Sequence, residues 1–227
     1  MILLVGLIGL VVGSLVNWAS DRLPAGSRPR LALGRWIGSL ATSGGPKPIP
    51  GFLGFDVAIE LLVALSWAAL AWRYGLTWQA LWLAVCCAFL ALLAAIDLKH
   101  RLVLNLMVGP AAVVAVLFFR FSPPGNWLAT LVGGGFAFLI FLAVAMIRPG
   151  SLGGGDVKLA GLVGLVVGFP TVIWALLLAV TLGGIVVALL LLSKRWTLKS
   201  TTPYAPFLCL GGMLALLYDP LPLLLSR

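Results

Sequence analysis

The chain has 227 residues, of which 62% are hydrophobic and only 9% charged, and its formal net charge at pH 7 is +9. This composition excludes a small water-soluble globular domain and indicates that lipid surrounds most of the surface. The basic excess does not indicate nucleic-acid binding, because membrane topology and attraction to anionic lipid head groups account for it. We expect a single transmembrane domain over residues 1–227, with the lipid bilayer as its partner.

Successive apolar runs have about the length that a helix needs to cross a bilayer core of about 30 Å. They predict an all-α, polytopic integral membrane protein with about eight transmembrane helices. The first run begins without a basic segment, so we interpret it as a membrane span and not as a cleaved signal peptide. The expected spans are 1–18, 56–72, 78–96, 102–119, 127–147, 156–168, 171–193 and 204–219.

Two segments depart from this regular alternation of spans and short loops. The segment 21–55 contains five prolines and many glycines and serines, so we expect a long cytoplasmic loop that is not helical throughout. The sixth span, 156–168, is short and rich in glycine. It is expected to be tilted, partly re-entrant, or buried among the other helices.

The positions of the basic residues predict the orientation, because cytoplasmic loops retain Lys and Arg. With eight spans, twelve of the fifteen Lys and Arg residues lie on one side of the membrane. We assign that side to the cytoplasm, which places both termini outside. The twelve are Arg22, Arg28, Arg30, Arg35, Lys47, Lys99, Arg101, Arg148, Lys158, Lys194, Arg195 and Lys199.

The three cysteines and two glycine triplets have plain structural interpretations. Cys86, Cys87 and Cys209 form no CxxC pair, so we interpret them as lipid-facing or packed thiols with no metal or redox role. The glycines of 133–135 favour close helix packing, whereas those of 153–155 favour a loop.

Four of the six acidic residues have structural or undecided roles. Asp21 is expected to pair with the adjacent Arg22, Asp56 to cap the second span, and Asp219 to face water on the outer side. Glu60 lies one turn inside the second span, on the same helix face as Asp56. It requires a partner at that depth, and both a structural hydrogen bond and a substrate contact fit.

Asp97 and Asp156 are the two candidate catalytic acids. Asp97 ends the third span and precedes Lys99 and Arg101, so an ion pair is its structural alternative. Asp156 follows a glycine triplet, and its structural alternative is the N-cap of the sixth helix. The alternating topology places both acids at the same depth on the cytoplasmic side, where a facing pair is possible.

A facing carboxylate pair predicts aspartyl-protease chemistry, because two nearby carboxyl groups do not both ionise easily. One acid takes a proton from water while its protonated partner stabilises the carbonyl oxygen and assists departure of the amine. This reaction needs no metal. His100 is the single histidine, so a zinc protease motif is absent, as are a GxSxG elbow and a P-loop.

Four ordered segments resemble the type IV prepilin peptidases, which are GxGD membrane aspartyl proteases. Residues 13–24 (GSLVNWASDRLP), which include Asn17 and Arg22, are similar to the family's GSxxN…YRLP segment. Residues 94–97 (AAID) and 153–159 (GGGDVKL) resemble its two catalytic segments, and 203–208 (PYAPFL) resembles the start of its last span. Glu60 is an acid in the second span, and this position also agrees with the family pattern.

The resemblance implies that Asp97 and Asp156 cleave the basic leader from prepilins or pseudopilins at the cytoplasmic face. It implies substrate-binding or supporting roles for Gly153, Gly155, Lys158, Glu60, Asn17 and Arg22. Many members also N-methylate the trimmed product with S-adenosylmethionine. No nucleotide-binding signature occurs in this sequence, so methylation stays open, and proteolysis needs no cofactor.

The sequence departs from the family pattern at two places, and two other functions are also considered. The first loop lacks the two CxxC pairs common in the family, and the usual Ile-Pro-Asp after the first catalytic acid reads Val103-Leu104-Asn105. A transporter or channel is one alternative, because intramembrane acids often mark ion pathways. A noncatalytic assembly factor of a pilus or secretion system is the other.

Overall fold

The protein is all-helical in a computed structural model that describes residues 2–23, 53–100, 105–122, 125–147, 152–192 and 204–218. The predicted fold class is confirmed, since helices are the only regular elements across those ranges. The elements are α1 (Ile2–Arg22), α3 (Leu53–Tyr74), α4 (Trp78–His100), α5 (Asn105–Leu117), the 3₁₀ turn η1 (Phe119–Phe121), α6 (Trp127–Ile147), α7 (Gly154–Val167), α8 (Thr171–Leu192) and α9 (Ala205–Leu217).

Each of the eight predicted spans corresponds to one α-helix. Within the described ranges, α1, α3, α4, α6 and α8 are long and apolar enough to cross a membrane, which makes this a membrane protein. The helices α5, α7 and α9 have 13, 14 and 13 residues. At 1.5 Å per residue they are about 20 Å long, shorter than the bilayer core. Of the expected loop 21–55, residues 24–52 lie outside the described part of the chain.

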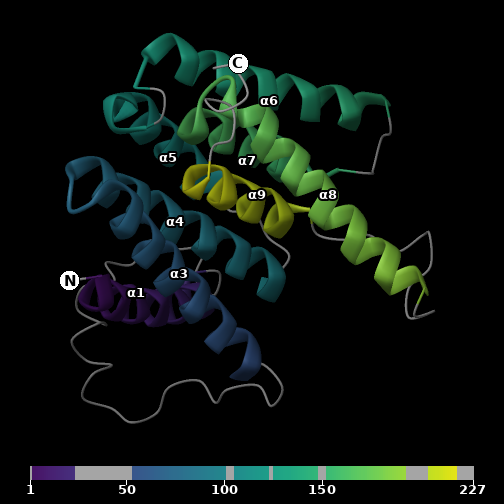
Figure 1. Ribbon diagram of the computed structural model, residues 1–227. Coiled ribbons are helices and arrows are strands. Elements are labelled where there is room, and N and C mark those ends of the chain that lie inside the picture. Colours follow the sequence, from purple (N-terminus) through teal and green to yellow (C-terminus); the bar gives the residue numbers. More distant parts are fainter. Residues whose placement is uncertain are drawn as a thin grey trace.

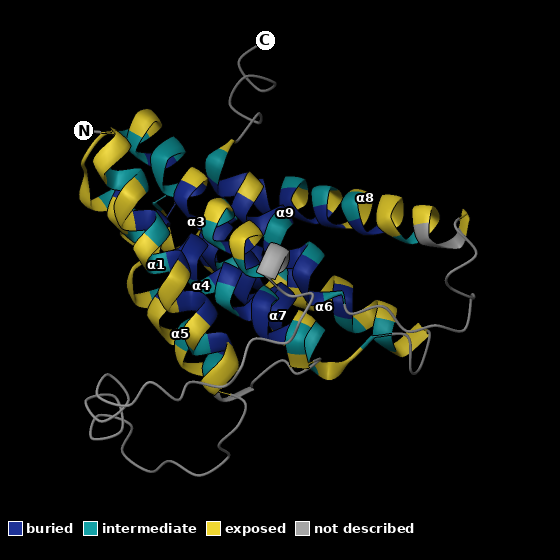
Figure 2. Ribbon diagram, turned by 90° about the horizontal axis from the view of Figure 1, so that it is seen from below, coloured by how far each residue is buried: buried dark blue, intermediate teal, exposed yellow. Residues whose placement is uncertain are grey.

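The short helices α7 and α9 lie with α4 at the centre of the helix assembly. Figure 1 shows α1 beside α3 on one flank and α8 beside α9 on the other, and α9 contacts both α4 and α7. The dark segments of Figure 2 are concentrated on α4, α7 and α9. Of the three alternatives for the sixth span, burial among other helices is therefore the one observed, because most of α7 is buried.

Glycines bring the backbones of α6 and α7 into contact, as the triplet at 133–135 predicts. A Cβ added at Gly133 would lie 2.6 Å from the carbonyl oxygen of Gly164, and one added at Gly164 would collide with Gly133. Gly134 faces the side chain of Leu165 with equally little space, whereas Gly135 has no neighbour within 4 Å. This close approach holds α7 against α6.

The three cysteines are packed inside the protein. Cys86, Cys87 and Cys209 are all buried and reduced. The lipid-facing alternative is excluded for each of them.

Candidate functional site

Asp97 lies in the last turn of α4, with its side chain turned into the protein. It is 5% exposed, although the neighbouring Leu98 and His100 are exposed. The sequence suggested Lys99 or Arg101 as an ion-pair partner for this acid, and Arg101 lies outside the described residues. Lys99 pairs instead with Asp21 and Asp56, because residues two apart on a helix point in different directions.

Asp156 lies in the first turn of α7, where its carboxylate folds back over the start of the helix. The N-cap of α7 is Gly153, so the prediction that Asp156 is the N-cap is wrong by three residues. The Asp156 carboxylate accepts a hydrogen bond from the backbone N–H of Gly153. Asp156 is the third residue of the helix, and an acid at that position commonly binds the backbone N–H of the N-cap residue in this way. The side chain is half-buried and so keeps a path to solvent.

Cys209 on α9 lies near both acids. Its sulfur hydrogen-bonds with the backbone of Ala94, one turn before Asp97, and it lies within electrostatic range of both Asp97 and Asp156. Tyr204, at the start of α9, lies within electrostatic range of Asp156 as well. The two acids therefore come from different helices to one region beside the first half of α9. Sequence reasoning missed Cys209 and Tyr204.

The other residues of the GGGDVK segment surround Asp156 at the exposed end of α7. Gly153 and Gly155 sit at and just after the N-cap, and Lys158 follows with an exposed side chain. A Cβ at position 153 would lie 3.6 Å from Oδ2 of Asp156, an ordinary contact. Neither this contact nor the backbone conformation of Gly153, which is extended, requires a glycine at this position. The contribution of Gly153 to the site is its backbone N–H, which binds the Asp156 carboxylate.

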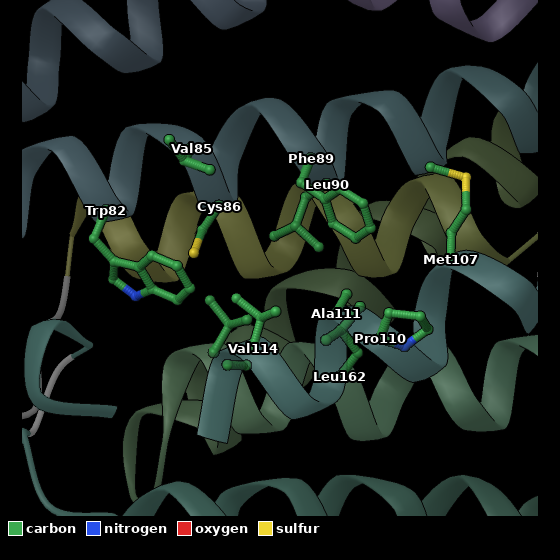
Figure 3. Close-up of a pocket in the computed structure, with 12 residues that line it drawn as sticks. Trp82, Val85, Cys86, Phe89, Leu90, Met107, Pro110, Ala111, Val114 and Leu162 are labelled. Carbon is green, nitrogen blue, oxygen red and sulfur yellow. The ribbon is translucent and has the colours of Figure 1, made fainter. Parts of the chain in front are cut away.

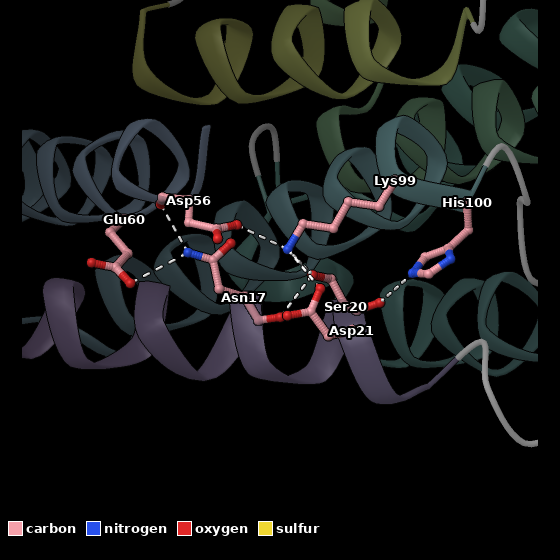
Figure 4. Close-up of polar contacts among 7 residues, drawn as sticks. All are labelled: Asn17, Ser20, Asp21, Asp56, Glu60, Lys99 and His100. Carbon is pink, nitrogen blue, oxygen red and sulfur yellow. Dashed lines mark hydrogen bonds and ion pairs between the residues drawn. The ribbon is translucent and has the colours of Figure 1, made fainter. Parts of the chain in front are cut away.

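A second group of polar side chains lies where the ends of α1, α3 and α4 meet. Figure 4 shows Lys99 at its centre. The Lys99 Nζ group donates to Oγ of Ser20 at 3.0 Å and pairs with Oδ1 of Asp21 and Oδ1 of Asp56, both at 2.9 Å. We call this group the polar cluster; its members are Asn17, Ser20, Asp21, Asp56, Glu60, Lys99 and His100.

Asn17 and Glu60 belong to this polar cluster. The Asn17 amide Nδ2 donates to the Asp56 carbonyl oxygen at 2.8 Å and to Oε1 of Glu60 at 3.3 Å. One turn before Asn17 on the same face, Gly13 lets α1 approach α3, since a Cβ there would lie 2.7 Å from Cα of Glu60. The first segment of the family resemblance thus fits the crossing of α1 and α3.

Two predicted ion-pair and capping roles are corrected by the polar cluster. Asp21 pairs with Lys99 and not with the adjacent Arg22, whose guanidinium lies 5.2 Å from the centre of the Trp18 ring. Asp56 does not cap α3, because that helix begins at Leu53 and places Asp56 in its first turn. Arg22 is exposed and stays outside the polar cluster.

We expect the substitution Lys99→Met to lower the free energy of unfolding by about 1–2 kcal/mol. It removes the ammonium between two carboxylates, and the loss is reduced because Asp21 and Asp56 are partly exposed. Thermal unfolding in detergent measures it. In the Lys99→Met background, Asp21→Asn should cost less than it costs alone, because the shared interaction has already gone. Equal costs in both backgrounds would show that the pair contributes nothing.

Two large cavities of the described residues are lined almost entirely by carbon. Figure 3 shows the first, of about 310 Å³, between α4 and α5 with Leu162 of α7 at its base. Its one indole, Trp82, donates its N–H to Ser122. The second, of about 800 Å³, lies between α1, α3 and the start of α4. Within the described ranges no group of His, Cys, Asp and Glu residues is arranged as a metal site.

Comparison with known proteins shows which family the chain resembles. Residues 84–188 match the model of the type IV leader peptidase family. A prepilin leader peptidase/N-methyltransferase of Bacillus subtilis (strain 168) is 31% identical over 71% of this chain and 65% of the relative. A protein of the same name from Pseudomonas aeruginosa is 26% identical over 70% of this chain and 57% of the relative.

The matched part of the chain thus spans less than two thirds of these relatives. No solved structure matches the chain. Residues 84–188 include both candidate acids, most of α4, and the whole of α6 and α7. The chain is similar to the type IV leader peptidase family over these residues, and to the prepilin leader peptidase/N-methyltransferase of Bacillus subtilis over 71% of its length.

Proposed function

We propose that this chain is a membrane aspartyl endopeptidase that removes the leader peptide from prepilins or pseudopilins at the cytoplasmic face of a bacterial inner membrane. The observation that carries the proposal is the position of Asp97 and Asp156 on separate helices, both within electrostatic range of Cys209. The relatives' names, prepilin leader peptidase/N-methyltransferase, supply the substrate class.

The surroundings of the two acids suit an acid–base pair that activates water. Asp97 is buried, whereas Asp156 is half-buried at a helix start whose first two glycines are exposed, and this suits the approach of water and a peptide from that side. One carboxyl group takes a proton from the water, whose oxygen attacks the scissile carbonyl. The protonated partner stabilises the developing oxyanion and then gives its proton to the departing amine.

The membrane orientation fits this substrate. Asp97 lies in the last turn of α4, beside Lys99 and His100. We infer that this end of α4 faces the cytoplasm, because cytoplasmic loops retain Lys and Arg. A substrate whose mature part begins with an apolar helix would keep that helix in the bilayer. Its leader would then emerge at the depth of the two acids. Both termini of the chain lie outside in this arrangement.

S-Adenosylmethionine is the cofactor that the relatives' methyltransferase name implies. It carries a sulfonium, an amino acid and a nucleoside, which need charged and hydrogen-bonding partners. The two apolar cavities described above offer almost none, so neither fits this molecule. We therefore derive no methylation step from the described part of the chain.

The test is cleavage of a prepilin by the purified protein in detergent or lipid, with the products weighed by mass spectrometry. We expect hydrolysis at a single bond after the basic leader. Adding S-adenosylmethionine to the same reaction shows whether the new N-terminus also gains a methyl group. A purified, folded protein that leaves several prepilins intact would contradict the proposal and favour a transporter or an assembly factor.

A further inference from the structure

The polar cluster carries more negative than positive charge. It contains the carboxylates of Asp21, Asp56 and Glu60, and Lys99 is the cation that pairs with two of them. Glu60 has no cation partner in the described part of the chain, and its side chain is half-buried, so it is accessible. In a chain with a net charge of +9, this surplus of carboxylates at the basic end is unusual.

A buried oxygen of Asn17 faces this surplus without a hydrogen-bond donor. Asn17 is 7% exposed, and its Oδ1 atom is buried with no partner. The amide orientation is determined, because Nδ2 donates to the Asp56 carbonyl oxygen and to Glu60, which are both acceptors. Figure 4 shows this amide between Glu60 and the ion pair of Asp56 with Lys99. An unpaired buried acceptor costs about 1–3 kcal/mol, which a donor from a ligand would recover.

We propose that Asn17, Asp56 and Glu60 form a subsite for a cationic side chain of the peptide substrate. The amide oxygen and the carboxylates together accept the hydrogen bonds of a lysine ammonium or an arginine guanidinium. Lys99 is shared between Asp21 and Asp56, and Glu60 supplies the carboxylate that no lysine or arginine of the described residues pairs with. This subsite rests on the proposed peptidase function and adds the part of the substrate that it recognises.

The geometry also sets where the cation lies in the substrate. Asp97 and Lys99 are two residues apart on α4 and point to different sides of that helix, Asp97 toward α9 and Lys99 toward α1 and α3. A helix with its side chains is about 10–12 Å wide. An extended peptide spans about 3.3–3.6 Å per residue, so the recognised cation lies about three residues from the scissile bond.

The test is a set of peptides in which a single lysine is moved residue by residue along the leader, each with a matched glutamine peptide. The measured quantity is the ratio of kcat/KM for the lysine peptide to that for its glutamine partner. For the unmodified protein we expect a maximum of about tenfold when the lysine lies about three residues from the bond. In Glu60→Gln the same ratio should fall toward one. In Glu60→Lys, a glutamate at that position should be preferred over lysine.

Because each ratio is taken within one variant, a general loss of folding or rate in Glu60→Gln does not affect it. A ratio that is the same in the unmodified protein and in Glu60→Gln overturns the subsite while leaving the peptidase function intact. If the lysine-to-glutamine ratio of kcat/KM is near one at every position in the unmodified protein, the subsite is overturned as well and the peptidase function is not affected. If the unmodified protein cleaves none of the peptides, the peptidase function is overturned and the subsite with it.

Discussion

Replacing Asp97 by asparagine is expected to lower the rate of leader cleavage by about 10²–10⁴-fold, and Asp156→Asn by a similar factor. Asparagine keeps the shape of the side chain but can neither take a proton from water nor give one to the leaving amine. The double variant should be little slower than either single one, because the two acids act as a unit. The measurement is the initial rate of prepilin cleavage by each purified variant, compared at equal concentration.

The matched control is Asp219→Asn, which removes a carboxylate that lies outside the described residues and is expected on the outer side of the membrane, so it should leave the rate unchanged. Thermal unfolding of each variant separates a lost proton transfer from a lost fold. Cleavage at a normal rate by Asp97→Asn or by Asp156→Asn would remove that residue from the mechanism. A double variant that is slower by the product of the two factors would indicate two independent roles.

Hydropathy predicted all the described α-helices, but it did not predict which of them are surrounded by other helices and which face lipid. The run at 156–168 is apolar whether it faces lipid or other helices, because lipid and a helix interior select the same side chains. Only the contacts of α7, with nine buried residues, show that it is surrounded by protein. The glycines at 133–135 predicted close helix packing, but nothing in the sequence identified Gly164 as the residue that they approach.

The polar cluster shows why the roles of charged residues are harder to predict than their presence. Neighbours along the chain suggested Arg22 as the partner of Asp21, and Lys99 or Arg101 as the structural alternative for Asp97. In the fold, Lys99 reaches Asp21 and Asp56, which are 78 and 43 positions away, on α1 and α3. Which helices lie side by side decides such pairs, and that information is not local. The family resemblance pointed to Asn17 and Glu60, which do meet, but it contained no sign of Lys99 or Cys209.

The substitution Gly133→Ala is expected to lower both the thermal stability and the cleavage rate. A Cβ at position 133 would lie 2.6 Å from the Gly164 carbonyl oxygen and 2.7–2.8 Å from backbone atoms of Gly168 and Phe169. Backbone cannot rotate away as a flexible side chain can, so α6 and α7 must separate. Such overpacking costs about 1–3 kcal/mol. A shift of α7 also displaces Asp156 in its first turn, and a misplacement of about 1 Å can cost about 10²-fold in rate.

Gly135→Ala, two residues along the same helix, is the matched control for this substitution. A Cβ there meets nothing within 4 Å, so the change adds helix propensity of up to about 1 kcal/mol without a clash. We expect the unfolding midpoint in detergent to fall for Gly133→Ala and to hold or rise for Gly135→Ala. The cleavage rate should fall in the first variant alone. Equal midpoints and equal rates for the two would mean that α6 and α7 are not in backbone contact, and the position of Asp156 would then need another cause.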